Sequence, residues 1–292
     1  MAAADLLAPL RDLVERGLRE LDLAVPGDLA DFSEAIHYPL LAGGKRIRPV
    51  LCLAAGETLG LRPADLLPTA LALELVHTFS LVHDDLPAMD DDDLRRGLPT
   101  THRRYGEDVA ILVGDALLAA AFELIAVRQV ATPERRLAAI ERLARATGPA
   151  GMIGGQYLDV RAPETIDEAG LQRLHRLKTG ALLEASVGCA IALADPRPAV
   201  ADALASFAAS LGLLFQIIDD VLDATGSDAS LGKPAGSDAR HGRRTYVSAL
   251  GLDAARERAE RCERTARAEL ARLPGETGPL VAVLEQVARR RR

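Results

Sequence analysis

Apolar residues recur every three or four positions through most of this chain, which is the spacing of an amphipathic or buried helix. The pattern is clearest at residues 6–25, 70–83, 108–127, 173–194 and 201–223. Ala and Leu, which favour helix, dominate, while alternating segments rich in β-branched and aromatic residues are missing. We therefore predict about ten helices and no sheet.

Turn-forming residues separate the helical stretches and indicate where each helix ends. They fall at Pro26–Gly27, Gly43–Gly44, Pro63, Pro87, Gly97–Pro99, Pro133, Gly148–Gly151, Pro196–Pro198 and Gly226–Gly242. None of these breaks is long enough for an interdomain linker, and no repeat of fixed period is present. The pattern predicts a single all-α domain over residues 1–292.

Composition narrows the function classes. Hydrophobic residues make up 49% of the 292 positions, which excludes a disordered chain, and 35 Lys+Arg against 42 Asp+Glu give a net charge of −7. This acidic balance argues against nucleic acid as a partner, because phosphate backbones select basic surfaces. An anionic substrate would need local basic groups or bound cations.

Cysteine use and the N-terminal sequence predict a cytoplasmic location. Cys52, Cys189 and Cys262 are far apart and odd in number, so neither a disulfide framework nor a zinc site is expected. No run approaches about 20 uninterrupted apolar residues, and the N-terminus lacks a basic segment followed by an apolar block. We expect no stable membrane association.

The densest chemical signal is an acidic run that packs six carboxylates into residues 84–93 directly after an apolar helix. Mg²⁺ takes oxygen ligands and prefers a few carboxylates plus substrate phosphates to a closed protein cage. Pro87 disfavours helical dihedrals at Leu86, so we expect the helix to end near Asp85 and a loop to bring Asp90 back toward Asp84. A solvated acidic loop at a helix end is the alternative for such a run.

A second acidic cluster follows the apolar segment 215–218. Asp219 and Asp223 are four residues apart and share one helical face, so they repel each other unless a cation lies between them. Two clusters of the same form make chance a poor explanation, and helices carrying them could face each other across one cavity.

Basic residues are also concentrated. Residues 43–49, GGKRIRP, place a flexible turn before three cations whose forks and backbone N–H groups can grip a diphosphate. Arg95 and Arg96 follow the first acidic run, and Lys178 and Lys233 stand beside glycines further on. Each of these could instead be an ordinary surface residue. The segment 154–159, GGQYLD, is compatible with tight helix packing, a supporting polar group, or both.

Together these segments resemble the trans-isoprenyl diphosphate synthases, and among them the bacterial farnesyl diphosphate synthase group. The resemblance rests on GGKRIRP at 43–49, LVHDDLPAMDDDDLRRG at 81–97, GDALL at 114–118, GGQYLD at 154–159, KTG at 178–180, FQIIDDVLD at 215–223, LGK at 231–233 and RTY at 244–246. It implies the isoprenoid synthase fold, antiparallel helices around a central apolar cavity, assembled as a homodimer.

The resemblance also implies a reaction. A Mg²⁺ cluster held by both aspartate motifs draws diphosphate off an allylic substrate, and the double bond of isopentenyl diphosphate attacks the allylic cation. The departing diphosphate can accept the proton that is lost. Such chemistry is physically coherent, because cations stabilise the leaving group and a dry apolar pocket protects the carbocation.

Carried over by position, the family pattern assigns roles to this chain. It implies metal ligation by Asp84, Asp90 and Asp219, with support from Asp85, Asp220 and Asp223. It implies isopentenyl diphosphate binding by Gly44, Lys45, Arg48, His77 and Arg96, and allylic diphosphate binding by Arg95, Lys178 and Lys233. Thr179 and Gln216 would line the reacting centre. At Arg243 the family commonly has lysine, so we assign that residue no role.

Product length should depend on the residues below Asp84. Ser80 and Phe79 precede it by four and five positions, about 6–7.5 Å along the helix axis. A bulky Phe79 as the floor of the pocket predicts an early stop and therefore a farnesyl product. A geranylgeranyl diphosphate synthase is the near alternative, and a terpene cyclase or a non-catalytic helical scaffold are more distant ones.

Overall fold

The computed structural model describes residues 3–23, 25–161, 167–225 and 245–289, and these are almost entirely helical, which confirms the all-α prediction. The elements are α1 Ala3–Arg19, η1 Gly27–Leu29, α2 Ala30–Leu41, α3 Ile47–Thr58, α4 Pro63–Asp84, β1 Leu94–Arg95, β2 Leu98–Pro99, α5 Thr101–Tyr105, α6 Glu107–Arg128, α7 Pro133–Thr147, α8 Met152–Val160, α9 Glu168–His175, η2 Arg176–Gly180, α10 Ala181–Ala194, α11 Pro198–Thr225, α14 Tyr246–Leu250, α15 Leu252–Leu270 and α16 Gly278–Arg289. Lys233 and Arg243 lie outside the described residues. That residues 1–292 form one domain stays a prediction.

The prediction of no sheet is wrong at one place. β1 and β2 pair antiparallel, with Leu94 opposite Pro99. The two residues between the strands, Arg96 and Gly97, both have positive φ, 55° and 79°, as a two-residue hairpin turn requires. Two residues per strand leave no periodic pattern for the sequence to display.

Prolines begin several helices at the places where the sequence predicts a break. α4, α7 and α11 start at Pro63, Pro133 and Pro198, where the missing N–H costs nothing because the first turn has no acceptor for it. Thr132 caps α7 by accepting from the backbone N–H of Arg135. Local sequence therefore determines these starts.

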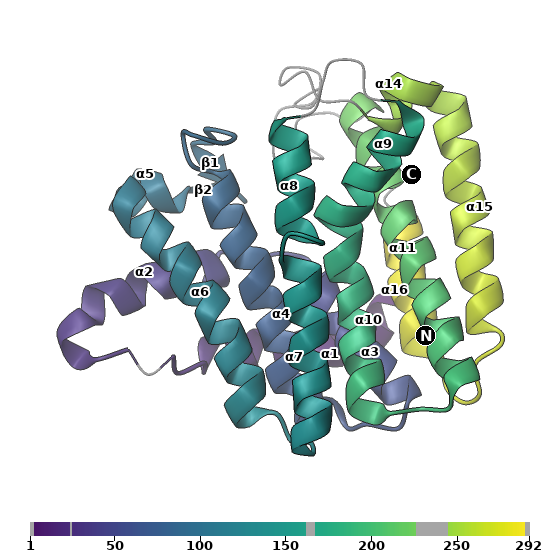
Figure 1. The fold of residues 1–292 in the computed structure, drawn as a ribbon, viewed down its shortest axis with the longest axis horizontal. Coiled ribbons are helices and arrows are strands. Elements are labelled where there is room, and N and C mark those ends of the chain that lie inside the picture. The colour runs from purple at the N-terminus through teal and green to yellow at the C-terminus, as the bar shows by residue number, and fades with distance from the viewer. Residues whose placement is uncertain (1–2, 24, 162–166, 226–244, 290–292) are drawn as a thin grey trace.

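The helices pack side by side into a bundle (Figure 1). α4 packs against α3 and α6, α10 packs against α7, α3 and α11, and α15 lies along α11. Buried residues surround α3, α4 and α10 on most sides, which explains why these segments carry few polar positions. All three cysteines are buried and unbridged.

Four helical segments are long and apolar enough to cross a membrane by length and composition, including α4, α6 and α11. None of these segments is an uninterrupted apolar run, so the sequence pattern predicted no helix of this kind. In three of the four, half or more of the most apolar window is buried against other helices of the bundle. α6 differs, because most of its apolar window stays outside the core.

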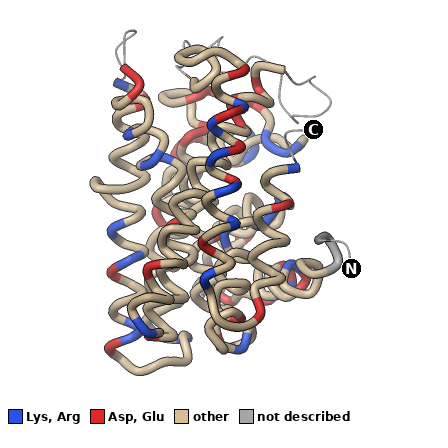
Figure 2. The backbone as a smooth tube through the Cα atoms, turned by 90° about the vertical axis from the view of Figure 1, so that its right-hand side faces the viewer, with Lys and Arg blue, Asp and Glu red and all other residues tan. Residues whose placement is uncertain are grey.

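The two acidic clusters meet at one end of the bundle. The loop carrying β1 and β2 follows α4 at the end where α11 also finishes (Figure 1). In Figure 2, acidic positions gather toward this end, while both signs of charge are interspersed along the outer helices. The fold thus places both aspartate-rich helix ends where a single ligand can reach them.

Candidate active site

The first acidic cluster begins at the end of α4, as predicted. α4 ends at Asp84 with Asp85 as its C-cap, and the backbone N–H of Asp90 donates to the carbonyl of Asp84 at 2.9 Å. The loop therefore returns Asp90 to Asp84. Burial, reinforced by the charge of Asp90 and opposed by that of Lys178, raises the pKa of Asp84 to about 6.

Asp85 and Arg95 form a close ion pair in this structure. Arg95 donates from Nε and Nη2 to Asp85 Oδ1 at 2.6 and 2.5 Å, and the Asp85 side chain is almost fully buried. A second carboxylate, Asp92, lies 3.4 Å from Arg95. From the sequence, Asp85 was expected to support the metal and Arg95 to bind the allylic diphosphate. In this structure the two pair with each other, and the pair fixes the start of the hairpin on the end of α4.

Three basic groups assemble beside this end of α4. Arg96 donates to the carbonyl of Gly43, and a Cβ at Gly44 would lie 2.7 Å from Arg96 Cζ. Gly44 therefore allows the guanidinium to lie on the backbone of the turn. The Nε of Arg48 is buried and makes no hydrogen bond with any residue described. Burial and the charges of Arg48 and Arg96 hold the pKa of His77 well below its usual range, so its ring is neutral at pH 7.

Arg46 has a different role from its neighbours. Its guanidinium donates to Glu74 at 2.6 Å, to Glu15 at 2.8 Å and to the carbonyl of Leu40 at 2.7 Å, and its side chain is fully buried. It adopts φ 49°, in the left-handed region. Arg46 therefore fixes the turn that presents Lys45, which is exposed, and Arg48.

The GGQYLD segment connects both halves of the site. On α8, Gln156 donates from Nε2 to Asp84 Oδ1 at 2.8 Å, and Asp159 accepts from Lys178 Nζ at 2.5 Å. A Cβ at Gly155 would lie 2.2 Å from the backbone nitrogen of Lys178, so only glycine permits this approach of α8 to η2. Both readings of the segment, tight packing and polar support, are confirmed.

η2 is a single turn of π-helix that carries Lys178 and Thr179. Such turns often occur at functional sites, because the extra residue redirects the side chains after it. Both residues are half-buried. The bulge directs Lys178 toward α8, where its charge also acts on Asp84.

The second cluster divides between two tasks. Asp220 is buried and accepts from Gln216 Nε2 at 2.7 Å and from the backbone N–H of Tyr246 at 2.6 Å. It ties α11 to α14 rather than presenting free oxygens. Asp219 is half-buried, and its charge acts on Arg48, which places it toward the cation group.

The donor set fits Mg²⁺ completed by a ligand rather than a closed metal cage. No group of three or more His, Cys, Asp or Glu within the described ranges could hold a metal ion alone. Asp84 and Asp90 are hard oxygen donors whose mutual repulsion contributes to the raised pKa of Asp84. A divalent ion that also takes phosphate oxygens would relieve that repulsion.

Phe79 and Ser80 occupy different sides of α4. Ser80 lies one turn below Asp84 on the same face, and its hydroxyl donates to the carbonyl of His77 at 2.8 Å. Phe79 is buried, and its ring meets that of His83 edge-on with centroids 5.0 Å apart. His83 Nε2 in turn donates to the carbonyl of Ile111 on α6, at 3.1 Å. Phe79 therefore points toward the α4–α6 contact.

Sequence reasoning did not assign several residues that complete this geometry. They are Glu15 and Glu74 around Arg46, Gln156 beside Asp84, Asp159 beside Lys178, and His83 beside Phe79. Glu74 carried a local signal, as a single acid within the apolar part of a helix, and Gln156 and Asp159 lie in the GGQYLD segment. His83 lies one helical turn after Phe79. The partners of the other residues depend on contacts between distant segments.

Comparison with known proteins agrees with this geometry. The polyprenyl synthetase family model matches residues 30–272. The chain belongs to this family. Polyprenyl synthetases of known structure share its fold: an FPP/GFPP synthase from Zymomonas mobilis superposes with a TM-score of 0.86 at 33% identity, covering 97% of this chain and 99% of its own. A geranyltransferase from Helicobacter pylori, complexed with magnesium and isoprenyl diphosphate, gives 0.85 at 29% identity over 99% and 98%.

Relatives in sequence include geranylgeranyl pyrophosphate synthases of plants. Geranylgeranyl pyrophosphate synthase 9 of Arabidopsis thaliana is 44% identical over 276 residues, which are 92% of this chain and 77% of the relative. The geranylgeranyl pyrophosphate synthase of Catharanthus roseus is 46% identical over 262 residues, 88% and 73%. The chain is therefore a prenyltransferase of isoprenoid biosynthesis.

Proposed function

We propose that this prenyltransferase condenses isopentenyl diphosphate with allylic diphosphates in a Mg²⁺-dependent reaction. The observation that carries the proposal is the group formed by Arg48, neutral His77 and Arg96 beside Asp84. The buried Nε of Arg48 finds no hydrogen-bond acceptor in the described part of the chain. Leaving a buried guanidinium donor unmatched is costly, so an anion such as a diphosphate supplies the missing acceptor.

Each side of the site then has its own diphosphate. Gly44, Lys45, Arg48, His77 and Arg96 bind isopentenyl diphosphate. Lys178, held by Asp159, binds the allylic diphosphate close to Asp84. Arg95 and Lys233 would add charge to the same ligand, and Thr179 and Gln216 would border the reacting carbons. This arrangement leaves the allylic leaving group next to the carboxylates.

Asp84, Asp90 and Asp219 would hold the Mg²⁺. The remaining motif acids, Asp85, Asp220 and Asp223, would support them, with Asp85 and Asp220 acting through Arg95 and Tyr246. When bound, the ions supply positive charge to the departing diphosphate. The magnesium and isoprenyl diphosphate in the Helicobacter pylori relative support this reading.

For the product we infer geranylgeranyl diphosphate, in preference to farnesyl diphosphate. The plant relatives, 44–46% identical, are geranylgeranyl synthases. Ser80, a small residue, lies directly below Asp84, while Phe79 points toward His83 and α6. The farnesyl product predicted from a Phe79 floor has less support, since that ring is held to one side of the path.

Incubation with isopentenyl diphosphate, Mg²⁺ and each of dimethylallyl, geranyl and farnesyl diphosphate, followed by product sizing, tests the activity. Asp84→Asn and Arg48→Gln should abolish turnover, while Asp91→Asn, an exposed acid in the same run, should retain it. Full activity of both site variants would contradict the mechanism. Phe79→Ala should leave a geranylgeranyl product unchanged, and a longer product would restore Phe79 as the floor.

We also propose a cytoplasmic homodimer that buries the outer face of α6. Ile111 and Leu112 on this helix are 45% and 55% exposed, and Val127 is 68% exposed. Large apolar side chains left exposed along one helix support an interface. Light scattering should give twice the chain mass, and Leu112→Glu should give monomers. A monomeric wild type that floats with liposomes would assign this face to a membrane instead.

A further inference from the structure

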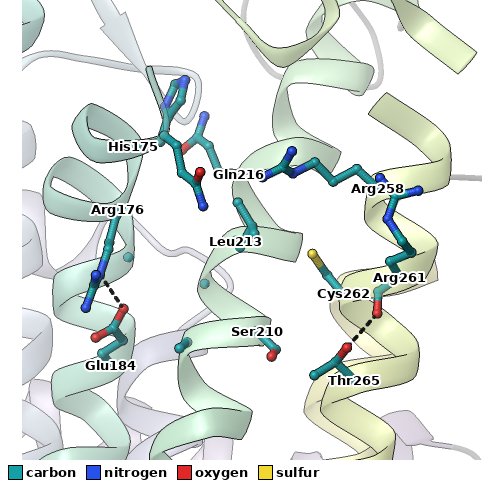
Figure 3. Close-up of a pocket in the computed structure, with 14 residues that line it drawn as sticks. His175, Arg176, Glu184, Ser210, Leu213, Gln216, Arg258, Arg261, Cys262 and Thr265 are labelled. Carbon is teal, nitrogen blue, oxygen red and sulfur yellow. Dashed lines mark hydrogen bonds and ion pairs between the residues drawn. The ribbon is translucent and has the colours of Figure 1, made fainter. Parts of the chain in front are cut away.

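A hollow of about 640 Å³ lies beside the second acidic helix, between η2, α11 and α15. Figure 3 shows His175 and Gln216 at one end of it and Arg258 and Arg261 reaching toward it from α15, with Leu213 of α11 between them. His175 Nε2 is buried and makes no hydrogen bond within the described residues; it lies 4.0 Å from Asp220 Oδ2, and its ring stacks on that of Tyr246 at the border of the hollow.

A second hollow of about 580 Å³ continues from the first, between α7, η2, α10 and α11. Arg176 and Glu184 border both, so the two hollows adjoin, and we call them together the arginine groove. Each half falls in the range of about 300–1,000 Å³ that is typical of small-molecule sites. The groove therefore suits a small ligand more than a docked protein.

The groove concentrates positive charge in a chain whose net charge is −7. Six arginines line it. Three of them are paired with acids: Arg176 with Glu184 at 3.7 Å, Arg258 with Glu168 at 2.7 Å and Arg261 with Glu257 at 3.9 Å. Arg142, Arg145 and Arg173 also line it, and none of the three has an ion pair or hydrogen bond with a residue that the structure describes. Neighbouring cations without counter-charges repel each other, so the groove favours an anion.

The floor of the groove is apolar and made of small residues. Alanines of α7, α10 and α11, with Gly188 and Ile191, face the second hollow. A Cβ at Gly188 would lie 3.5 Å from Arg142 Cδ, so the arginine stem lies along this glycine. Apolar ligand surface placed here loses contact with water, while the guanidinium groups remain at the rim.

We propose that the arginine groove, which shares Gln216 with the candidate active site, is a second binding site for a phosphate or diphosphate ester of an apolar chain. Guanidinium forks match phosphate oxygens bidentately, and the small-residue floor takes the chain. The proposal does not depend on the length of the enzymatic product.

The test measures binding of dodecyl phosphate to the full-length protein by equilibrium dialysis in EDTA. Arg142→Gln/Arg173→Gln, which removes unpaired cations from two walls of the groove, should weaken binding at least tenfold. The matched control Arg256→Gln/Arg264→Gln changes exposed arginines of α15 that border neither hollow and should bind as the wild type does. Equal affinity of the groove variant and the wild type would overturn the proposal.

Three further arms identify the source of the anion. Arg48→Gln, in the candidate active site, should leave dodecyl phosphate binding intact. If Arg48→Gln lost binding and the groove variant kept it, the probe would bind in the catalytic centre instead. Inorganic phosphate should bind more weakly than dodecyl phosphate, since equal binding would refute a role for the apolar floor. Vesicles containing phosphatidylglycerol should not retain the protein. The small-molecule site would be refuted if the vesicles retained the wild type but not the groove variant, and if the wild type did not bind dodecyl phosphate.

Discussion

Gly114 of α6 makes room for the ring of His83, and this contact yields a quantitative prediction. A Cβ at Gly114 would lie 2.1 Å from His83 Nε2. Gly114 is a buried residue in the middle of a helix, and its φ is not positive, so the backbone itself would accept alanine. Gly114→Ala must therefore displace His83 from Phe79 and from the Ile111 carbonyl.

The expected cost follows from these contacts. Overpacking costs about 1–3 kcal/mol, and losing the His83 hydrogen bond costs about 0.5–1.5 kcal/mol. The higher helix propensity of alanine returns about 1 kcal/mol. We expect Gly114→Ala to lower the free energy of unfolding by a net value of about 0.5–3.5 kcal/mol, measured by urea denaturation.

Two further variants isolate the cause. Gly188→Ala, in the middle of α10, brings its Cβ no closer than 3.5 Å to Arg142, so it should be neutral or stabilising by up to about 1 kcal/mol. In a His83→Ala background, Gly114→Ala should no longer destabilise, because the clashing ring is gone. The reasoning fails if Gly114→Ala is as stable as the wild type, or if its cost persists without His83.

Three other predictions concern charged groups. Arg46→Met leaves Glu74 buried without its partner and should lower the free energy of unfolding in urea by about 3–5 kcal/mol. The double variant Arg46→Met/Glu74→Leu should recover most of that loss. An equal loss in both variants would refute the pairing argument. The depressed pKa of His77 means that below pH 6.5 only the unfolded chain protonates this ring, so stability falls as pH falls, and His77→Gln should flatten that slope. Asp159→Asn removes the charged partner of Lys178. This change should raise KM for the allylic diphosphate on the order of tenfold or more and leave KM for isopentenyl diphosphate within about twofold. Steady-state kinetics that show the reverse would contradict the assignment.

Neighbouring residues of one motif show where prediction from sequence stops. Arg46 and Arg48 both follow the Gly43–Gly44 turn, and nothing local distinguishes them. Their difference comes from Glu15 and Glu74, which are 31 and 28 residues from Arg46 along the chain. Those acids neutralise Arg46 in the interior, while Arg48 keeps a donor that no described residue satisfies.

The direction of Phe79 shows the same limit. Its distance from Asp84 along the helix was predictable, because helical rise is uniform. The side to which the ring turns depends on His83 and α6, so the inference of a pocket floor could not be drawn from spacing alone.

The sequence by itself determined the all-helical architecture, the breaks at proline and glycine, and the return of Asp90 to Asp84, because these follow from periodicity and from the conformational limits of one proline. Only the tertiary structure decided which charges pair. Asp85 pairs with Arg95 and Lys178 with Asp159, while Asp220 accepts from the backbone N–H of Tyr246, each at least ten residues away. The physical reason is that a charge is neutralised by whatever the fold brings within a few ångströms, and packing of distant segments sets that distance.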